Sequence, residues 1–135
     1  RLDVDMALEP VYWHPLEDLE TTVEVFEKMN SNRLKMIFDP ANVLEFPEID
    51  QNAYWKEWLC VLGDKVEAIH MKDFVVQDGK LVSVAAGTGE MNYEKIIRFI
   101  KERKPYIHVT LENTTPENAV QSKEYIQGLY DSCRI

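Results

Sequence analysis

Four residues of types that commonly bind divalent metal ions each follow a short apolar segment of the chain. Three are carboxylates and one is an imidazole: Glu9, Asp39, His70 and Glu112. This mostly oxygen donor set suits Mn²⁺, Mg²⁺ or Co²⁺ and can also bind Zn²⁺, so we expect one divalent metal ion whose identity stays open. Such an ion could polarise a carbonyl and hydroxyl pair on a substrate while carboxylates move the proton.

The segments that would position these residues alternate between strand-like and helix-like spacing of apolar residues. This alternation predicts an α/β fold of four βα units, with parallel strands and outer helices. Expected strands cover residues 2–8, 34–38, 66–70 and 107–111, and a hairpin is expected over 74–84. Four helices are expected. The first begins at Pro15, the second carries an apolar stripe over residues 55–62, the third is capped by Asn92, and the fourth begins at Thr115.

All four candidate ligands stand at the carboxyl ends of the expected strands. In parallel α/β folds this edge gathers ligands and chemistry, because the loops there converge. Since successive strand residues face opposite sides, Glu9 and Glu112 fall on the polar side of their strands. The pattern is less clean for Asp39, which shares a side with Ile37, and ambiguous for the third strand, where Glu67 falls on the helix side. We expect the four side chains to converge on one point.

The composition disfavours several classes of protein. The length of 135 residues suits a single domain, expected over residues 1–135, and a formal net charge of -9 argues against nucleic acid as a partner. No apolar run is long enough to span a membrane. Cys60 and Cys133 are far apart, which favours reduced thiols and a cytoplasmic location. The chain opens at Arg1 with a strand already under way, so we interpret it as a fragment.

Five short motifs resemble, in order, the second-half motifs of the xylose-isomerase-like superfamily. That superfamily includes sugar epimerases, sugar-phosphate isomerases, inosose dehydratases and apurinic endonucleases. Each motif alone is weak, but the ordered set covers essentially the whole chain. The motifs are Leu8-Glu9-Pro10, Phe38-Asp39-Pro40-Ala41-Asn42, Ile69-His70-Met71-Lys72-Asp73, Gly87-Thr88-Gly89-Glu90 and Leu111-Glu112-Asn113.

The resemblance implies that this chain forms the C-terminal half of a (β/α)8 TIM barrel, strands five to eight. It implies that Glu9, Asp39, His70 and Glu112 are the metal ligands. Within this set, Glu9 and Glu112 would also be the catalytic acid and base pair, acting on opposite faces of the substrate carbon.

Three further residues are implied to bind substrate: Asn42, Lys72 and Asp73. The motif does not fix which of Lys72 and Asp73 touches the substrate. Where many members of the superfamily carry a histidine, this chain has Asn42. An amide can hydrogen-bond a sugar hydroxyl but does no acid/base work near neutral pH, so the reaction itself stays open.

By the same resemblance, the expected function is that of a divalent-metal-dependent isomerase or epimerase, acting on a small sugar or sugar phosphate through a metal-bound enediolate. The alternatives are an inosose-dehydratase-like lyase, a zinc apurinic endonuclease-like hydrolase, and a non-catalytic barrel relic that acts as a binding domain. We expect the fragment alone to be inactive. Its expected partner is the N-terminal half of the barrel or a second copy of the chain.

Overall fold

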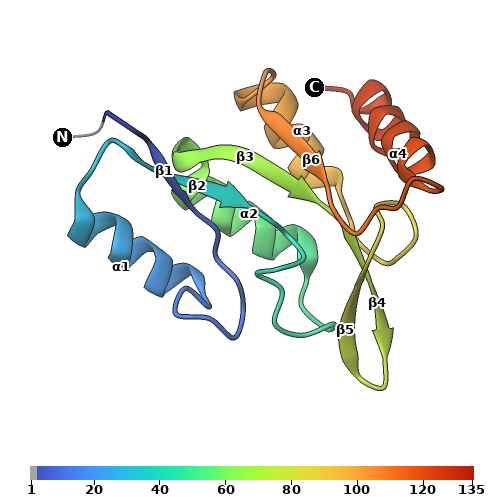
Figure 1. Cartoon of the computed structure of the whole chain (residues 1–135), viewed down its shortest axis with the longest axis horizontal. Coiled ribbons are helices and arrows are strands. Elements are labelled where there is room, and N and C mark those ends of the chain that lie inside the picture. The colour runs from blue at the N-terminus through green and yellow to red at the C-terminus, as the bar shows by residue number, and fades with distance from the viewer. Residues whose placement is uncertain (1–2) are drawn as a thin grey trace.

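The chain forms a four-stranded parallel sheet with four helices, in a computed structural model that describes residues 3–135. The sheet order is β1-β2-β3-β6, and each neighbouring pair is parallel (Figure 1). The predicted α/β class is therefore confirmed. The strands are β1 (Met6–Leu8), β2 (Leu34–Phe38), β3 (Val66–Met71) and β6 (His108–Leu111), and the helices are α1 (Leu19–Met29), α2 (Gln51–Leu62), α3 (Glu94–Arg103) and α4 (Ala119–Ser132).

Two smaller elements flank β3. A short 3-10 helix, Gly63–Lys65, leads into it, and an antiparallel hairpin of β4 (Asp73–Gln77) and β5 (Lys80–Val84) follows it. The hairpin turn holds Asp78 at φ 50° and Gly79 at φ 73°. Two consecutive positive φ angles are typical of the type I′ turn, so the hairpin expected from Asp-Gly is confirmed.

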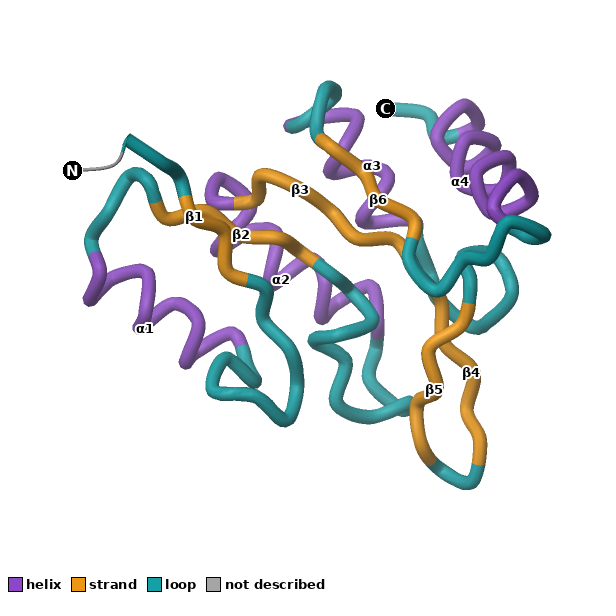
Figure 2. The backbone as a smooth tube through the Cα atoms, viewed as in Figure 1, coloured by secondary structure: helices purple, strands orange, loops and turns teal. Residues whose placement is uncertain are grey.

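One side of the sheet packs against helices (Figure 2). Along β2, Leu34, Met36 and Phe38 are buried, while the residues between them are only partly buried. They join a hydrophobic core whose largest members, Trp55 and Trp58 of α2, are fully buried. The opposite side of the sheet is therefore the one that carries the alternate, more polar residues.

A register shift explains the irregular pattern of the third strand. Neighbouring residues of β2 pair with Val66 and Ala68, so Glu67 has no partner residue on β2. The extra residue forms a bulge, which reverses the alternation of sides. Val66 and Ile69 are both buried, whereas His70 is only partly buried and lies on the opposite side. The bulge thus removes the ambiguity that Glu67 created.

The first strand is shorter than the expected strand over residues 2–8. It begins at Met6, and Leu2 lies outside the described residues. In the described sheet β1 is an edge strand that pairs with β2, so its length is limited by where β2 begins. Asp3 and Asp5 instead form ion pairs with Arg33, which directly precedes β2.

Two helices begin later than expected, because the residues before them form a cap or a turn instead. The first follows Asp18 rather than Pro15, since the Asp18 carboxylate accepts a hydrogen bond from the backbone N–H of Thr21. The last follows Asn118 rather than Thr115. Residues 115–118 form a turn in which the Thr115 N–H donates to the Asn118 side chain at 2.7 Å.

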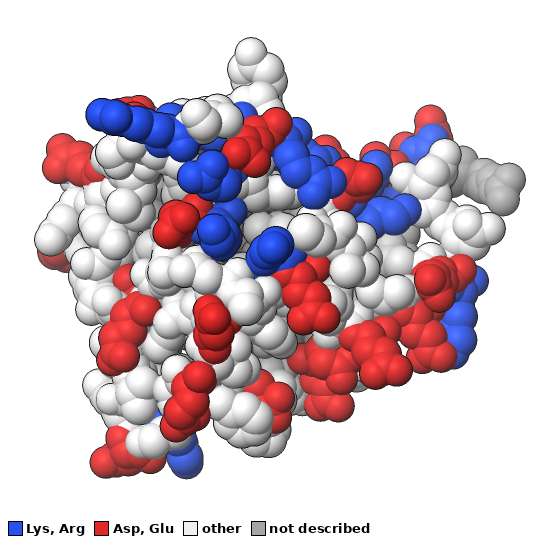
Figure 3. Space-filling model, turned by 180° about the vertical axis from the view of Figure 1, so that it is seen from behind, with Lys and Arg blue, Asp and Glu red and all other residues white. Residues whose placement is uncertain are grey.

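Charged side chains of both signs cover the side of the molecule that faces away from the viewer in Figure 1. Acidic groups are spread over the lower part of this surface and basic groups gather towards its upper edge (Figure 3). Among residues 3–135, each helix is too short or too polar to cross a membrane.

Candidate metal centre

The four predicted ligands meet at the carboxyl ends of the parallel strands. One ligand atom from each of Glu9, Asp39, His70 and Glu112 lies within 4.8 Å of the chosen atoms of the other three. Three of these residues directly follow a strand, and His70 is the next-to-last residue of β3. Because the strands are parallel and adjacent, residues that are far apart in sequence arrive at the same edge.

Asn42 orients two of the candidate ligands. Its Nδ2 donates a hydrogen bond to Oε1 of Glu9 at 2.8 Å, and its backbone N–H donates to Oδ1 of Asp39 at 3.1 Å. Its carbonyl oxygen accepts a hydrogen bond of 2.8 Å from the backbone N–H of Tyr12. Asn42 therefore links the loops after β1 and β2, and it also lines a cavity beside the cluster.

Asp39 is the buried member of the cluster, with 0% of its surface exposed. Its Oδ1 accepts hydrogen bonds from the backbone N–H groups of Ala41 and Asn42, in the turn that Asp-Pro begins. This turn holds the carboxylate at the end of β2. Burial raises the pKa of Asp39 above its usual range, although the neighbouring Lys72 acts in the opposite direction.

Lys72 lies between two carboxylates. Its Nζ is 2.9 Å from Oδ2 of Asp39 and 2.9 Å from Oε2 of Glu112. Burial acts to lower the pKa of Lys72, but the two carboxylates outweigh burial and raise it, so the ammonium stays charged. Burial acts to raise the pKa of Glu112, and here Lys72 outweighs it, so that the pKa is lowered and the carboxylate stays ionised.

The donor atoms fit a divalent cation. Among the described residues, Oδ2 of Asp39 and Nδ1 of His70 are buried and make no aligned hydrogen bond. The imidazole nitrogen lies 2.8 Å from Oε1 of Glu112 and 3.3 Å from Oε1 of Glu9, at the centre of the cluster. Buried polar atoms that make no aligned hydrogen bond are rare and costly, and two of them within one cluster of acidic and imidazole side chains suit a bound cation.

The charge balance leads to the same conclusion. Three carboxylates and the Lys72 ammonium leave two negative charges in a partly buried cluster. Like charges this close repel one another strongly at low dielectric. A doubly charged cation would neutralise the cluster, and oxygen atoms with one imidazole nitrogen are ligands that such cations accept.

Asp73 faces the following loop. Its Oδ1 accepts hydrogen bonds from the backbone N–H groups of Phe74 at 2.9 Å and Met91 at 2.8 Å. Its Oδ2 accepts another from Gly87 at 3.1 Å, and the side chain is buried. We therefore infer that Lys72 is the member of the Lys-Asp pair that reaches the site, while Asp73 holds the loop of residues 85–91 in place.

Tyr93 is a supporting residue that the sequence analysis did not single out. Its buried hydroxyl donates a hydrogen bond of 2.8 Å to the backbone carbonyl of Lys72. Its ring packs edge-on against Tyr125 of α4, with 5.9 Å between ring centroids. No spacing of apolar residues could have indicated the bond to Lys72, because that bond depends on how α3 packs against β3.

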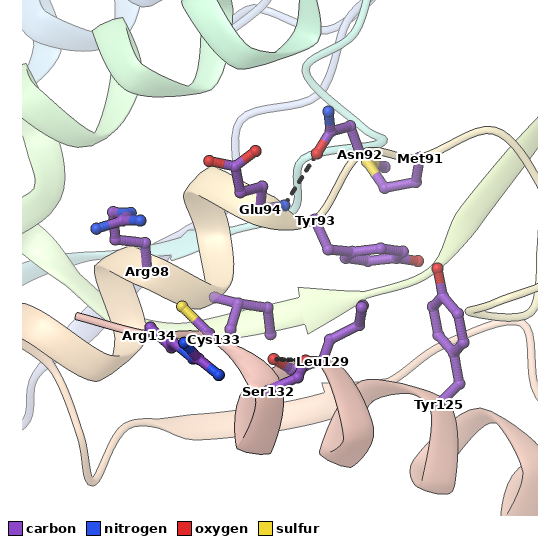
Figure 4. Close-up of a pocket in the computed structure, with 11 residues that line it drawn as sticks. Met91, Asn92, Tyr93, Glu94, Arg98, Tyr125, Leu129, Ser132, Cys133 and Arg134 are labelled. Atoms are coloured by element: carbon purple, nitrogen blue, oxygen red, sulfur yellow. Dashed lines mark hydrogen bonds between the residues drawn. The ribbon is translucent and has the colours of Figure 1, made fainter.

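Tyr93 and Tyr125 stand at one end of a cavity of about 640 Å³ between α3 and α4 (Figure 4). Its other lining residues include Arg98 and Cys133, which belong to α3 and to the chain end after α4. This cavity is therefore separate from the ligand cluster, which lies at the strand ends.

The chain belongs to the family described as xylose isomerase-like TIM barrel, which matches residues 1–129. The resemblance found in the motifs is thereby confirmed, and the four βα units correspond to part of a barrel of that type. A comparison with curated proteins finds no match.

Three solved structures share the fold. A xylose isomerase domain protein from Planctomyces limnophilus is 22% identical, with a TM-score of 0.68 over 96% of this chain and 46% of that one. The probable 3-DHS dehydratase AsbF of petrobactin synthesis, from Bacillus anthracis, is 17% identical, with a TM-score of 0.67 over 93% of this chain and 48% of that one.

The third structure is the IOLI protein, solved with a bound zinc atom. It is 19% identical, with a TM-score of 0.65 over 97% of this chain and 50% of that one. The chain thus spans about half the length of each of these proteins. The similarity shows the fold, which is shared by proteins of different activities.

Proposed function

We propose that the complete protein is a divalent-metal-dependent isomerase or epimerase of a small sugar. The observation that carries this proposal is the convergence of Glu9, Asp39, His70 and Glu112 at the carboxyl edge of the sheet. A divalent cation held by these residues would polarise the carbonyl and hydroxyl groups of the substrate and stabilise the charge of an enediolate. The neighbour solved with zinc supports a metal in this fold.

Glu9 and Glu112 are the proposed acid and base pair. Their side chains are 29% and 31% exposed, whereas Asp39 is buried, so they are the carboxylates that a substrate can approach. Because Lys72 lowers the pKa of Glu112, this carboxylate is ionised near neutral pH and can accept a proton from the carbon beside the carbonyl. Glu9, held by Asn42, would deliver a proton from the other side.

We propose further that the substrate site is completed by four more βα units. In the described sheet β1 and β6 are edge strands, and a closed barrel leaves no edge. These units would come from an N-terminal half of the protein or from a second copy. Sedimentation distinguishes the two when the mass of the particle is compared with the verified mass of one chain. A second copy makes the particle twice as heavy as one chain, whereas an N-terminal half on the same chain does not.

The proposed reaction is tested with the complete protein in deuterated water. We expect about one divalent ion per site, loss of turnover after chelation, and recovery with Mn²⁺, Mg²⁺, Co²⁺ or Zn²⁺. Because the proton passes through a carboxylate, the product of a ketose or aldose screen should carry solvent deuterium at the reacting carbon, detected by NMR. A protein that binds no metal and exchanges no carbon-bound hydrogen with any sugar would contradict the proposal and favour a binding domain.

A further inference from the structure

A second cavity opens beside the ligand cluster. It measures about 580 Å³ and is bounded by the loop after β1, the loop after β2 and the β4–β5 hairpin, which follow the carboxyl ends of β1, β2 and β3 (Figure 1). This volume suits a small organic ligand. Asn42 joins the cavity to the cluster, because it lines the cavity and donates its hydrogen bond to Glu9.

Trp13 is the unusual residue of this cavity. It is 82% exposed and has a φ of 74°. It occupies the third position of a turn in which the N–H of His14 donates to the carbonyl of Val11 at 3.1 Å, where a positive φ favours glycine. An indole that is both exposed and strained contributes little to stability, and residues of this kind cluster at ligand sites.

The surroundings of Trp13 hold it in place. The ring centroid of Tyr12 lies 4.3 Å from that of Trp13 and 6.3 Å from that of Phe46. The Tyr12 hydroxyl donates to Oε1 of Glu45 at 2.9 Å, and its backbone N–H donates to the carbonyl of Asn42. The aromatic surface is therefore built in advance and is tied to the residue that orients Glu9.

We propose that Trp13 and Phe46 form a stacking platform for the non-reacting part of a neutral sugar or polyol ring. This assignment rests on the proposed function, because it places the rest of the substrate while the cluster acts on its carbonyl end. The face of such a ring carries C–H bonds that pack on an aromatic surface, and its hydroxyls lie at the rim. Asn42, Glu45 and Lys80 line the same cavity and supply polar partners for that rim.

The charges around the platform disfavour a phosphorylated ring. The charged groups that line the cavity, Glu45 and Lys80, cancel, and a metal-loaded cluster would be neutral, so the described residues offer a phosphate dianion no net positive charge. The loop of residues 85–91 is no phosphate cradle either. Its amide groups at Gly87, Thr88 and Glu90 donate to protein oxygens, and Gly87 donates to the Asp73 carboxylate.

The platform can be tested by fluorescence, since Trp13 is exposed while Trp55 and Trp58 are each 0% exposed. In the metal-loaded complete protein, the part of the acrylamide quenching that is lost in Trp13→Phe reports on Trp13. The probes are D-fructose, D-xylose and myo-inositol, with D-fructose 6-phosphate as the charged counterpart. We expect at least one neutral probe to protect Trp13 from quenching, and D-fructose 6-phosphate to bind more weakly than D-fructose.

Substitutions of Trp13 test whether its ring contributes to the binding of the probe or only lies near it. Trp13→Ala should weaken the binding of the protecting probe, measured by calorimetry, about tenfold, which is the scale of one lost aromatic contact. Trp13→Phe should keep most of the affinity while removing the fluorescence signal. Tyr106→Ala is the matched control, because Tyr106 is 97% exposed but precedes β6 at the opposite end of the sheet, and its affinity should equal that of the wild type.

The results also separate this inference from the proposed function. Glu112→Gln should lower turnover and leave the protection of Trp13 unchanged. If a probe protects Trp13 in the wild type but is not turned over, the proposed reaction is contradicted and the platform stands. Turnover with an unchanged KM in Trp13→Ala would sink the platform and keep the reaction. The platform is equally overturned if no neutral probe protects Trp13 at 100 mM (roughly the limit of weak binding), or if D-fructose 6-phosphate binds more tightly than D-fructose.

Discussion

Lys72 and Glu112 form an ion pair at the heart of the candidate metal centre, with 2.9 Å between Nζ and Oε2. The same ammonium lies 2.9 Å from Oδ2 of Asp39. It therefore offsets part of the repulsion among the carboxylates before any cation arrives. The ligands can then be held close together by the protein alone, which reduces the reorganisation that metal binding requires.

Replacing Glu112 by glutamine should lower kcat by about 10²–10⁴-fold, the usual contribution of a general acid or base. The amide keeps the shape of the side chain but cannot accept the proton. The melting temperature should change little, because the introduced amide retains an oxygen that can accept from Lys72. Glu48→Gln, in the loop after β2, is the control and should behave as the wild type. Activity within a few-fold of wild type in Glu112→Gln would refute the assigned role.

Replacing Asp39 by asparagine should act through the metal. The loss of a ligand carboxylate should weaken metal binding by about 100-fold or more, since even outer partners of a metal ligand contribute 10–100-fold. Competition with a chromogenic chelator measures this, and excess metal should restore part of the turnover. The metal-free protein should not lose stability, because burial already disfavours the charged form of Asp39 and the amide oxygen can still accept from Ala41. A stable protein with unchanged metal affinity would exclude Asp39 as a ligand.

Tyr93→Phe tests the bond between the Tyr93 hydroxyl and Lys72, which is expected to contribute about 1 kcal/mol at neutral pH. Burial raises the pKa of Tyr93 well above its ordinary value of 10.0. The folded state therefore keeps a proton that the unfolded state releases, and this stabilisation is full below pH 10.0 and is lost as the pH rises further. Urea unfolding should show a shallower alkaline decline in Tyr93→Phe. The exposed Tyr106→Phe should follow the wild-type curve at every pH.

Two glycines should respond in opposite directions to alanine. A Cβ on Gly89 would overlap the Phe74 carbonyl oxygen and the Asp73 carboxylate, so Gly89→Ala should destabilise the protein by about 1–3 kcal/mol and disturb the loop of residues 85–91. A Cβ on Gly128, inside α4, would meet nothing within 4 Å. Gly128→Ala should therefore stabilise by up to about 1 kcal/mol. Thermal unfolding measures both, and equal effects would contradict this view of the loop.

Local patterns in the sequence predicted the parts of the fold that depend on neighbouring residues. The alternation over residues 34–38 matched β2, and Asp78-Gly79 predicted the hairpin turn. The order of strands and ligands was enough to predict that Glu9 and Glu112 approach each other. These features depend on chain direction and strand parity, which the sequence carries directly.

Features that depend on packing between distant segments were not predicted. The bulge at Glu67 arises from the pairing of β3 with β2, and the three hydrogen bonds to Asp73 arise from the fold of a loop up to 18 residues away. Trp13 gave no signal at all, because a positive φ at a residue other than glycine has no sequence pattern. In each case the conformation of the residue depends on the segment that packs against it, and the residue type alone does not determine it.

The unpaired position of Glu67 has a consequence for insertions and deletions. A deletion inside a central strand normally turns the side chains on one side of it to the wrong face. Here, removing Glu67 would leave Val66 followed by Ala68, which already face consecutive residues of β2, so the ladder would become regular and His70 would keep its side. Removing Ala68 instead would bring the Glu67 carboxylate into the ladder in its place. At the start of β3, deletion of the Glu67 codon should therefore have little effect on the fold, whereas deletion of the Ala68 codon should be more disruptive.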